Sequence, residues 1–332
     1  MAPNRDGVPD KRKKGEGGAV TKEEVAARGT GVHSVVDDYI SGNVFSEVRV
    51  FFTGLMFLTR LPCPSHIDHH PAYFMRSLTY FPVFGLMIGL WSASAYGAIS
   101  ALWGPAIASI GSTLASVWLT GCFHEDGLSD SFDGFGGGWS KKEILKIMKD
   151  SRVGTYGAVG LLTFTSLKFV ALTQLGERNL AESALIAAHV LGRATSAPLI
   201  YSCLYVQDEE DAKGDLYNWM AQSQRLVGPW RTAASSVSAA VISLCVLGGR
   251  LGFSAIALTI CASFAAGCYG NAIIGGVMGD FLGATICITE VCVYMLLLVD
   301  TDAIFDPPVW IFAGTACLPF FYMRKVVELN AC

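Results

Sequence analysis

The sequence predicts an all-α fold: a polytopic bundle of about eight transmembrane helices, with one further helix in the membrane interface. The 332 residues are 52% hydrophobic and only 16% charged, whereas soluble globular chains carry about a quarter charged residues. The mean hydropathy is +0.44, and residues 77–123 contain no charged side chain. Because the net charge of -4 is too small to indicate a polyanionic partner, we expect a lipid membrane and no nucleic acid as partner.

The chain is expected to have two parts. Residues 1–41 are polar and rich in glycine and charge, which predicts a disordered head. This head has too many acids for a transit peptide and no apolar core for a secretory signal, although its length leaves an organellar membrane open as a location. Residues 42–332 are expected to form one transmembrane catalytic domain, in which residues 124–153 are a cytoplasmic acidic and glycine-rich loop followed by an amphipathic helix.

The individual helices are predicted from apolar runs, because a crossing helix needs about 20 mostly apolar residues. Residues 45–61 form a shorter segment that carries Glu47, Arg49 and Arg60, so this segment is predicted to lie in the interface. The eight runs that qualify as spans are residues 78–100, 101–123, 154–175, 181–205, 233–249, 253–274, 281–299 and 309–322.

Basic residues predict the orientation of these spans. If eight spans are counted, the lysine-containing loops all fall on one side of the membrane. By the positive-inside rule this side is the cytoplasm, which places the protein in the cytoplasmic (inner) membrane with both termini inside. The basic segments are residues 11–14, 60–76, 141–152, 213–231 and 324–325.

The segment HEDGLSDSFDG, residues 124–134, places four carboxylates directly after the uncharged run. On a helix, Asp126, Asp130 and Asp133 are spaced by four and three residues and share one face. Like charges this close repel, so a divalent cation or a cluster of Arg and Lys must neutralise them. Mg²⁺ often binds through few carboxylates together with substrate phosphates, which favours phosphoryl chemistry. A solvated acidic loop is the alternative.

A glycine-rich stretch and a short helix follow these acids. Residues 136–138 are glycines, whose backbone can approach an anion and donate to it. Ser140 and Glu143 predict a capping box that opens an amphipathic helix. The segment KDSR then places Lys149 and Arg152 beside the acids, as a diphosphate site needs. Solvated or lipid-facing lysines are the alternative interpretation of this helix.

His124 and Glu125 begin like the zinc motif HExxH. Position 128 is Leu, however, so the second zinc ligand is missing and a zinc site is rejected. His124 is expected to contact substrate or to hydrogen-bond at a helix end. The ten cysteines form no CxxC pair and are expected to pack inside helices.

A second group of ionisable residues lies inside the later spans. Asp280 and Glu290 interrupt apolar runs, and ionisable groups at membrane depth are costly enough to indicate function. His189 and Arg193 are four residues apart, so they share a helix face and could meet these acids. A buried structural ion pair is the alternative for these charges.

Four motifs occur in order along the chain: FLTRLP (57–62), HEDGLSDSFDGFGGGW (124–139), ILKIMKDSRVGTYG (144–157) and GGVMGDFLGATICITE (275–290). Together they resemble the cobalamin synthase family, the adenosylcobinamide-GDP ribazoletransferases. The resemblance runs from about residue 51 to the C-terminus. Cys122 and Phe123 depart from the family pattern, and Ser131 and Phe132 occupy tolerant positions, so neither change touches a carboxylate. The polar head is longer than the family usually carries, which is the larger departure.

This resemblance implies a membrane enzyme that uses Mg²⁺ to join α-ribazole, or its 5'-phosphate, to adenosylcobinamide-GDP with release of GMP. Other cobalamin-assembly enzymes are possible partners. The expected metal ligands are Asp126, Asp130, Asp133 and Asp280. The expected catalytic residues are Glu125, Asp133 and His124. Glu125 is the first candidate for the general base, and Asp133 is the second. The expected substrate-binding residues are Arg60, Gly136, Gly137, Gly138, Lys149, Arg152, His189 and Arg193.

Two other functions are alternatives to the one that this resemblance implies. A CDP-alcohol phosphotransferase also sets aspartates on membrane helices, but the segment DGLSD lacks the Ala-Arg step which that family needs. A cation transporter using Asp280 and Glu290 would need no nucleotide, and no internal repeat is visible to support it.

Overall fold

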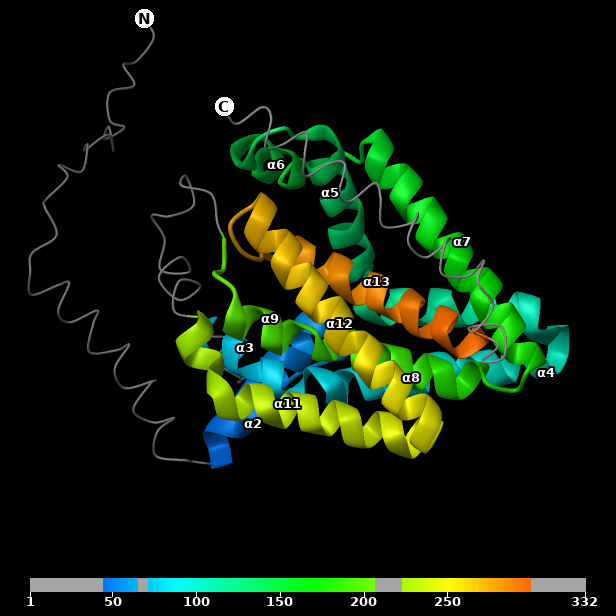
Figure 1. The fold of residues 1–332 in the computed structure, drawn as a ribbon. Coiled ribbons are helices and arrows are strands. Elements are labelled where there is room, and N and C mark those ends of the chain that lie inside the picture. The colour runs from blue at the N-terminus through cyan, green and yellow to red at the C-terminus, as the bar shows by residue number, and fades with distance from the viewer. Residues whose placement is uncertain (1–43, 65–70, 207–222, 300–332) are drawn as a thin grey trace, which may run out of the picture. The chain divides into compact units, whose positions relative to one another are not determined.

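The computed structural model describes residues 44–64, 71–206 and 223–299. Residue contacts separate a first unit, Met1–Ser46, from a second unit, Glu47–Cys332, and the long apolar helices belong to the second. The predicted head, the last predicted span (309–322) and several of the basic segments lie outside the described residues. Within the described residues the fold is helical, as predicted, and the only β-pairing is an isolated parallel bridge between Tyr205 and Val277 (Figure 1).

The first membrane span folds back on itself. Helix α4, Phe81–Thr120, contains Gly104, whose φ of 80° and ψ of 175° break the helix just before Pro105. The Ser92 hydroxyl donates to the Ser112 carbonyl at 2.9 Å, although twenty residues of straight helix would be about 30 Å long. Helix α4 is therefore a helical hairpin, and it covers most of both spans predicted at residues 78–100 and 101–123.

The other long helices match the predicted spans. In the part of the chain that the structure describes, six segments are long and apolar enough to cross a membrane. Since α4 is folded in two, they account for seven of the eight predicted spans. The chain is an integral membrane protein. Besides α4, these spans contain α7 (Thr155–Glu177), α8 (Ala181–Ala194) with α9 (Ser196–Ser202), α11 (Ser223–Leu247), α12 (Gly249–Ile273) and α13 (Gly279–Leu298).

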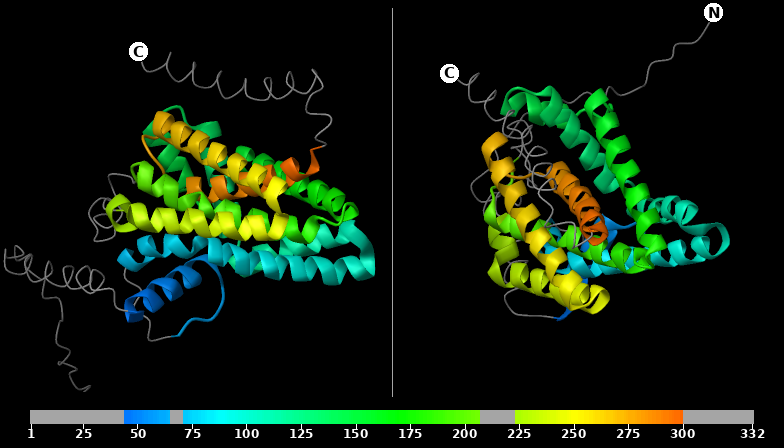
Figure 2. Two further views of the ribbon diagram at one scale, coloured as in Figure 1. Left: turned by 60° about the horizontal axis from the view of Figure 1, so that its bottom comes forward. Right: turned by 45° about the vertical axis from the view of Figure 1, so that its right-hand side comes forward.

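Helices α8 and α13 form the centre of this bundle. In the most apolar stretch of the span formed by α8 and α9, 83% of the residues are buried, and in that of α13 72%, against 17% and 22% for the spans of α11 and α12. Figure 2 (right) shows α13 between α12 and α7. Small residues let α4 approach α8 closely, because a methyl group at Gly89 would lie 2.7 Å from the Ile186 Cα. The polar side chains near the middle of these helices, His189, Arg193 and Glu290, are therefore buried inside protein.

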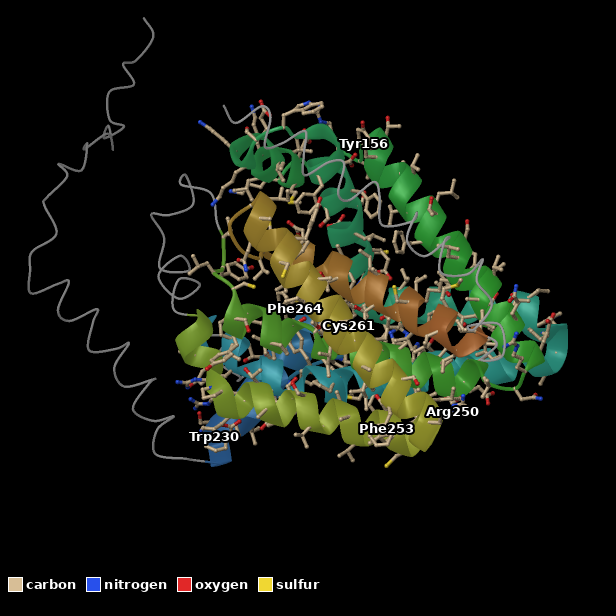
Figure 3. All side chains as sticks on the ribbon, in the orientation of Figure 1. Tyr156, Trp230, Arg250, Phe253, Cys261 and Phe264 are labelled. Carbon is tan, nitrogen blue, oxygen red and sulfur yellow. The ribbon has the colours of Figure 1, made fainter. Side chains whose placement is uncertain are left out.

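The outer helices present large apolar side chains to the surroundings. Trp230 on α11 and Phe253 and Phe264 on α12 are well exposed, and they are labelled in Figure 3. Such a surface suits contact with lipid. Before α4, the chain forms α2 (Val44–Leu58), α3 (Pro71–Ser77) and a 3-10 turn (Leu78–Tyr80). Helix α2 occupies the segment predicted to be interfacial, and its place in a membrane stays a prediction.

The prediction of a loop at residues 124–138 is wrong. Helix α5 runs from Phe123 to Gly137 and includes both the acids and most of the glycines. Helix α6, Lys141–Met148, is the predicted amphipathic helix. Glycine disfavours helix by about 1 kcal/mol per residue relative to alanine. In α5 this cost is offset by packing, because its glycines lie against neighbouring helices.

Candidate active site

A sharp turn aims α5 away from α4. Gly121 and Cys122 both adopt left-handed conformations, with φ of 70° and 62°, and α5 begins at the next residue. A methyl group at Gly121 would lie 2.6 Å from Nε of Arg60, so the Arg60 guanidinium lies against this turn. The Arg60 amide also donates to the Leu119 carbonyl at 2.8 Å. Arg60, a predicted substrate contact, is thus fixed beside the start of the acidic helix.

Three carboxylates from two distant segments form the acid cluster, which we define as Asp126, Asp130 and Asp280. Gly127 packs α5 directly onto α13, since a methyl group there would lie 2.7 Å from the Asp280 carbonyl oxygen. Burial, together with the negative charges of Asp126, Asp280 and Asp133, raises the pKa of Asp130 to about 7. The structure therefore brings the predicted ligand Asp280 to the acids of α5.

The acid cluster suits a hard cation in its chemistry, because carboxylate oxygens are the ligands that Mg²⁺ prefers. Among the described residues, no group of three or more His, Cys, Asp or Glu side chains is arranged to hold a metal ion. Mg²⁺ usually binds through one or two carboxylates and completes its shell with water and substrate phosphates. One or two members of the cluster would suffice for such a site, and the metal assignments stay predictions.

Asp133 has a structural task that the sequence did not reveal. Its two carboxylate oxygens accept the amides of Gly154 and Gly157 at 2.7 and 2.8 Å. Gly154 is the N-cap of α7, so Asp133 supplies the cap side chain from another helix. The Cβ of any larger residue at Gly154 or Gly157 would collide with the Asp133 carboxylate. This role accounts for both oxygens of Asp133 without a metal.

The glycines after the acids pack and do not form an open anion site. The amides of Gly136 and Gly137 lie inside α5, and the Gly138 amide donates to the Gly134 carbonyl at 2.9 Å. Gly136 leaves room for the ring of Tyr156, at the start of α7 (Figure 3). Because these amides are already satisfied within the helix, the geometry does not support their predicted role as backbone contacts to substrate.

The start of α6 agrees with the sequence. Ser140 is the N-cap and its side chain accepts the Glu143 amide at 3.4 Å, while Glu143 accepts the Trp139 amide at 3.0 Å. Beyond the helix, Arg152 forms an ion pair of 2.5 Å with Asp150, and its side chain is 86% exposed. The pair lowers the pKa of Asp150 to about 2. Arg152 therefore points to its neighbour in the chain instead of to the acid cluster.

A buried charge network occupies the centre of the bundle. We use this name for Lys168, His189, Arg193 and Glu290. The carboxylate of Glu290 lies 2.9 Å from Lys168 Nζ, 2.7 Å from His189 Nδ1 and 2.9 Å from an Arg193 guanidinium nitrogen. His189 and Arg193 do meet one of the two predicted acids, and Glu290 is only 4% exposed. A structural ion network fits this burial better than the predicted substrate contact.

Lys168 is not identified as a member of this network by the sequence analysis. It lies on α7 and reaches Glu290 from a distance of 122 residues in the chain. The available signal was that it is the only charged residue in the apolar run 154–175, and a lone lysine inside a membrane span is expected to have a buried partner.

His124 and Glu125 lie between the two charged groups. His124 is 2% exposed, and its Nε2 has no hydrogen-bond partner in the described structure. Burial, and then the positive charge of Arg193, lower the pKa of His124. Burial also raises the pKa of the Glu125 carboxyl. His124 is thus a neutral imidazole. One carboxylate oxygen of Glu125, Oε2, is likewise buried without a hydrogen-bond partner in the described structure. The charges that act on both residues are those of the buried charge network.

Comparison with known proteins decides the family. Residues 50–298 match the family described as cobalamin-5-phosphate synthase. The chain belongs to this family. Similar relatives are named adenosylcobinamide-GDP ribazoletransferase: the protein of Shewanella oneidensis is 37% identical over 256 residues, which is 76% of this chain and 95% of the relative. The protein of Shewanella frigidimarina is 36% identical over 254 residues, with shares of 76% and 95%. No solved structure matches.

The cobalamin-5-phosphate synthase match includes every predicted site residue, from Arg60 to Asp280, and also Glu290 and Lys168. It begins within α2 and ends with α13. The polar head lies before the matched region, so the family assignment says nothing about the function of the head.

Proposed function

We propose that the chain is an adenosylcobinamide-GDP ribazoletransferase, which transfers the adenosylcobinamide phosphate group to α-ribazole or its 5'-phosphate and releases GMP. The activity is that named for its relatives. The observation that carries the proposal is the acid cluster: a protein of this family gathers three carboxylates from α5 and α13, and none of them has an ion-pair partner among the described residues.

One or two of Asp126, Asp130 and Asp280 would hold Mg²⁺, which when bound would neutralise charge on the diphosphate of the donor. A ribose hydroxyl that is free in both α-ribazole and its 5'-phosphate attacks the phosphorus on the cobinamide side, and the bond from that phosphorus to the bridging oxygen breaks. GMP departs with the bridging oxygen and the electron pair. Glu125 would take the proton of the attacking hydroxyl, because burial raises the pKa of its carboxyl, as a general base needs.

The site faces the cytoplasm of a bacterial inner membrane in this proposal. Helix α6, which carries three lysines, lies at the same end of the bundle as α5 (Figure 1), and basic residues favour the cytoplasmic side. Both substrates are soluble in water, so a cytoplasmic site gives them direct access. Lipid and other cobalamin-assembly enzymes are the expected partners.

The deciding experiment is release of GMP by the detergent-purified protein supplied with adenosylcobinamide-GDP and α-ribazole, with and without Mg²⁺. GMP that depends on the metal and matches new cobalamin mole for mole is expected. A folded preparation that releases none would contradict the transferase proposal, and diphosphate-donor alcohols would then be the next substrates.

A further inference from the structure

The first residue of α6 reaches the turn that leads into α13. Gly275 in this turn has φ of 80°, a conformation that favours glycine. A methyl group at Gly275 would lie 3.3 Å from Lys141 Nζ, and no other atom of the surroundings would be within 4 Å. The Lys141 ammonium group thus stands over an otherwise open glycine turn.

This turn is anchored on both sides. The Val206 amide donates to the Val277 carbonyl at 2.7 Å, and the Val277 amide donates to the Leu204 carbonyl at 2.8 Å. The Tyr205 side chain hydrogen-bonds to the backbone of Gly279. Asp280, a member of the acid cluster, follows immediately. The lysine therefore faces a fixed backbone that also carries a carboxylate of the candidate active site.

Lys141 has no ion pair among the residues that the structure describes, and neither has any member of the acid cluster. Lys141 stands over the turn that leads to Asp280, the α13 member of the acid cluster, and the two do not form an ion pair. A ligand that carries both negative charge and a bound cation could contact both the lysine and the cluster. A diphosphate with Mg²⁺ has this character, because the metal would lie on the acids while phosphate oxygens accept from the lysine.

We propose that Lys141, over the Gly275 turn, binds the diphosphate of the nucleotide-bearing substrate. The proposal rests on the proposed function and names the substrate group that this part of the site recognises. It assigns to Lys141 the task that the sequence suggested for Arg152, whose guanidinium is paired with Asp150. Lysine acts here as a point charge for phosphate.

The test is binding of GDP with Mg²⁺ to the full-length protein in detergent, measured by equilibrium dialysis. Lys141→Met should weaken GDP binding about tenfold or more, because a hydrogen bond to a charged group is lost. Lys142→Met, the next residue on the same exposed helix start, should stay within about twofold of wild type. Equal affinities for Lys141→Met and wild type, or equal losses in both variants, would overturn the proposal.

A glycine pair gives a second test. Gly275→Ala introduces a methyl group against the Lys141 ammonium. Gly104→Ala is the matched control, because Gly104 has the same φ of 80° but a methyl group there would have no atom within 4 Å. GDP binding should fall in Gly275→Ala and persist in Gly104→Ala. Loss in both, or in neither, would count against the role of Lys141.

The two proposals fail separately. GDP binding can be measured without turnover. If the wild-type protein binds GDP through Lys141 but releases no GMP, the transferase proposal is contradicted and the diphosphate subsite is still supported. If wild type and Lys141→Met release GMP equally well at limiting donor concentration, only the proposal of a subsite at Lys141 is contradicted.

Discussion

The acid cluster and the buried charge network use the same residue types in opposite ways. In the network, one carboxylate is surrounded by Lys168, His189 and Arg193 at 2.7 to 2.9 Å. In the cluster, three carboxylates repel one another, and the pKa of Asp130 rises to about 7 through burial and the neighbouring acids. Buried charges that are paired with opposite charges serve the fold. Like charges that are clustered at a partly exposed position indicate a binding site for a ligand of opposite charge.

Helix α13 joins the two regions. It contributes Asp280 in its first turn to the cluster and Glu290 to the network. These residues are ten apart, which corresponds to about 15 Å along a helix. The network holds α7 and α8 to α13 at mid-depth, and this leaves the start of α13 to be placed by its contacts with α5 and with Tyr205.

The largest effect is expected in the network. Glu290→Gln leaves the Lys168 and Arg193 cations buried without a counter-charge, which should lower the free energy of unfolding by about 3–5 kcal/mol. Thermal unfolding of the purified protein measures this, with Glu177→Gln at the exposed end of α7 as the control. Adding Lys168→Met should recover part of the loss. A Glu290→Gln variant as stable as the control would refute a structural role.

In the cluster, the same kind of substitution should spare the fold and remove activity. Asp130→Asn keeps the shape of the side chain but removes a charge from the site, so we expect GMP release to fall about a hundredfold to a thousandfold. Unfolding temperature should stay at the wild-type value or rise, because a repelling charge is gone. Asp150→Asn is the control, since that acid is exposed and pairs with Arg152. Near-normal turnover by Asp130→Asn would contradict the metal assignment.

A smaller effect is expected at Tyr205, next to the cluster. Burial and the Asp280 carboxylate raise the pKa of Tyr205 to about 12, so its phenol stays neutral at ordinary pH. Tyr205→Phe removes the hydrogen bond to Gly279 and loosens the start of α13. The Mg²⁺ concentration for half-maximal activity should rise about tenfold, as for other residues that support a metal ligand. Tyr201→Phe, which is exposed, should not change it; an equal response of both variants would contradict this role.

The sequence predicted what depends on local pattern. Apolar runs located the spans, and the break predicted between residues 100 and 101 lies at Gly104. Predictions from the sequence failed where contacts between distant segments determine the local structure or the role of a residue. The glycines of α5 indicated a loop because their intrinsic preference opposes helix, but packing on α7 and α13 makes this segment helical. Likewise, spacing grouped Asp133 with Asp126 and Asp130, whereas its amide partners lie 21 and 24 residues further along the chain.

Asp133 tests the distinction between a ligand-binding acid and a structural acid. Its spacing in the sequence is that of a metal ligand, whereas its contacts in the structure are those of a helix cap. Asp133→Asn retains one carbonyl oxygen for the amides of Gly154 and Gly157, so the loss of stability should be about 1 kcal/mol. Activity should fall far less than in Asp130→Asn, with the Mg²⁺ requirement unchanged. If Asp133→Asn instead keeps wild-type stability and needs more Mg²⁺, the acid belongs with the cluster, and α7 is capped well enough by the remaining oxygen.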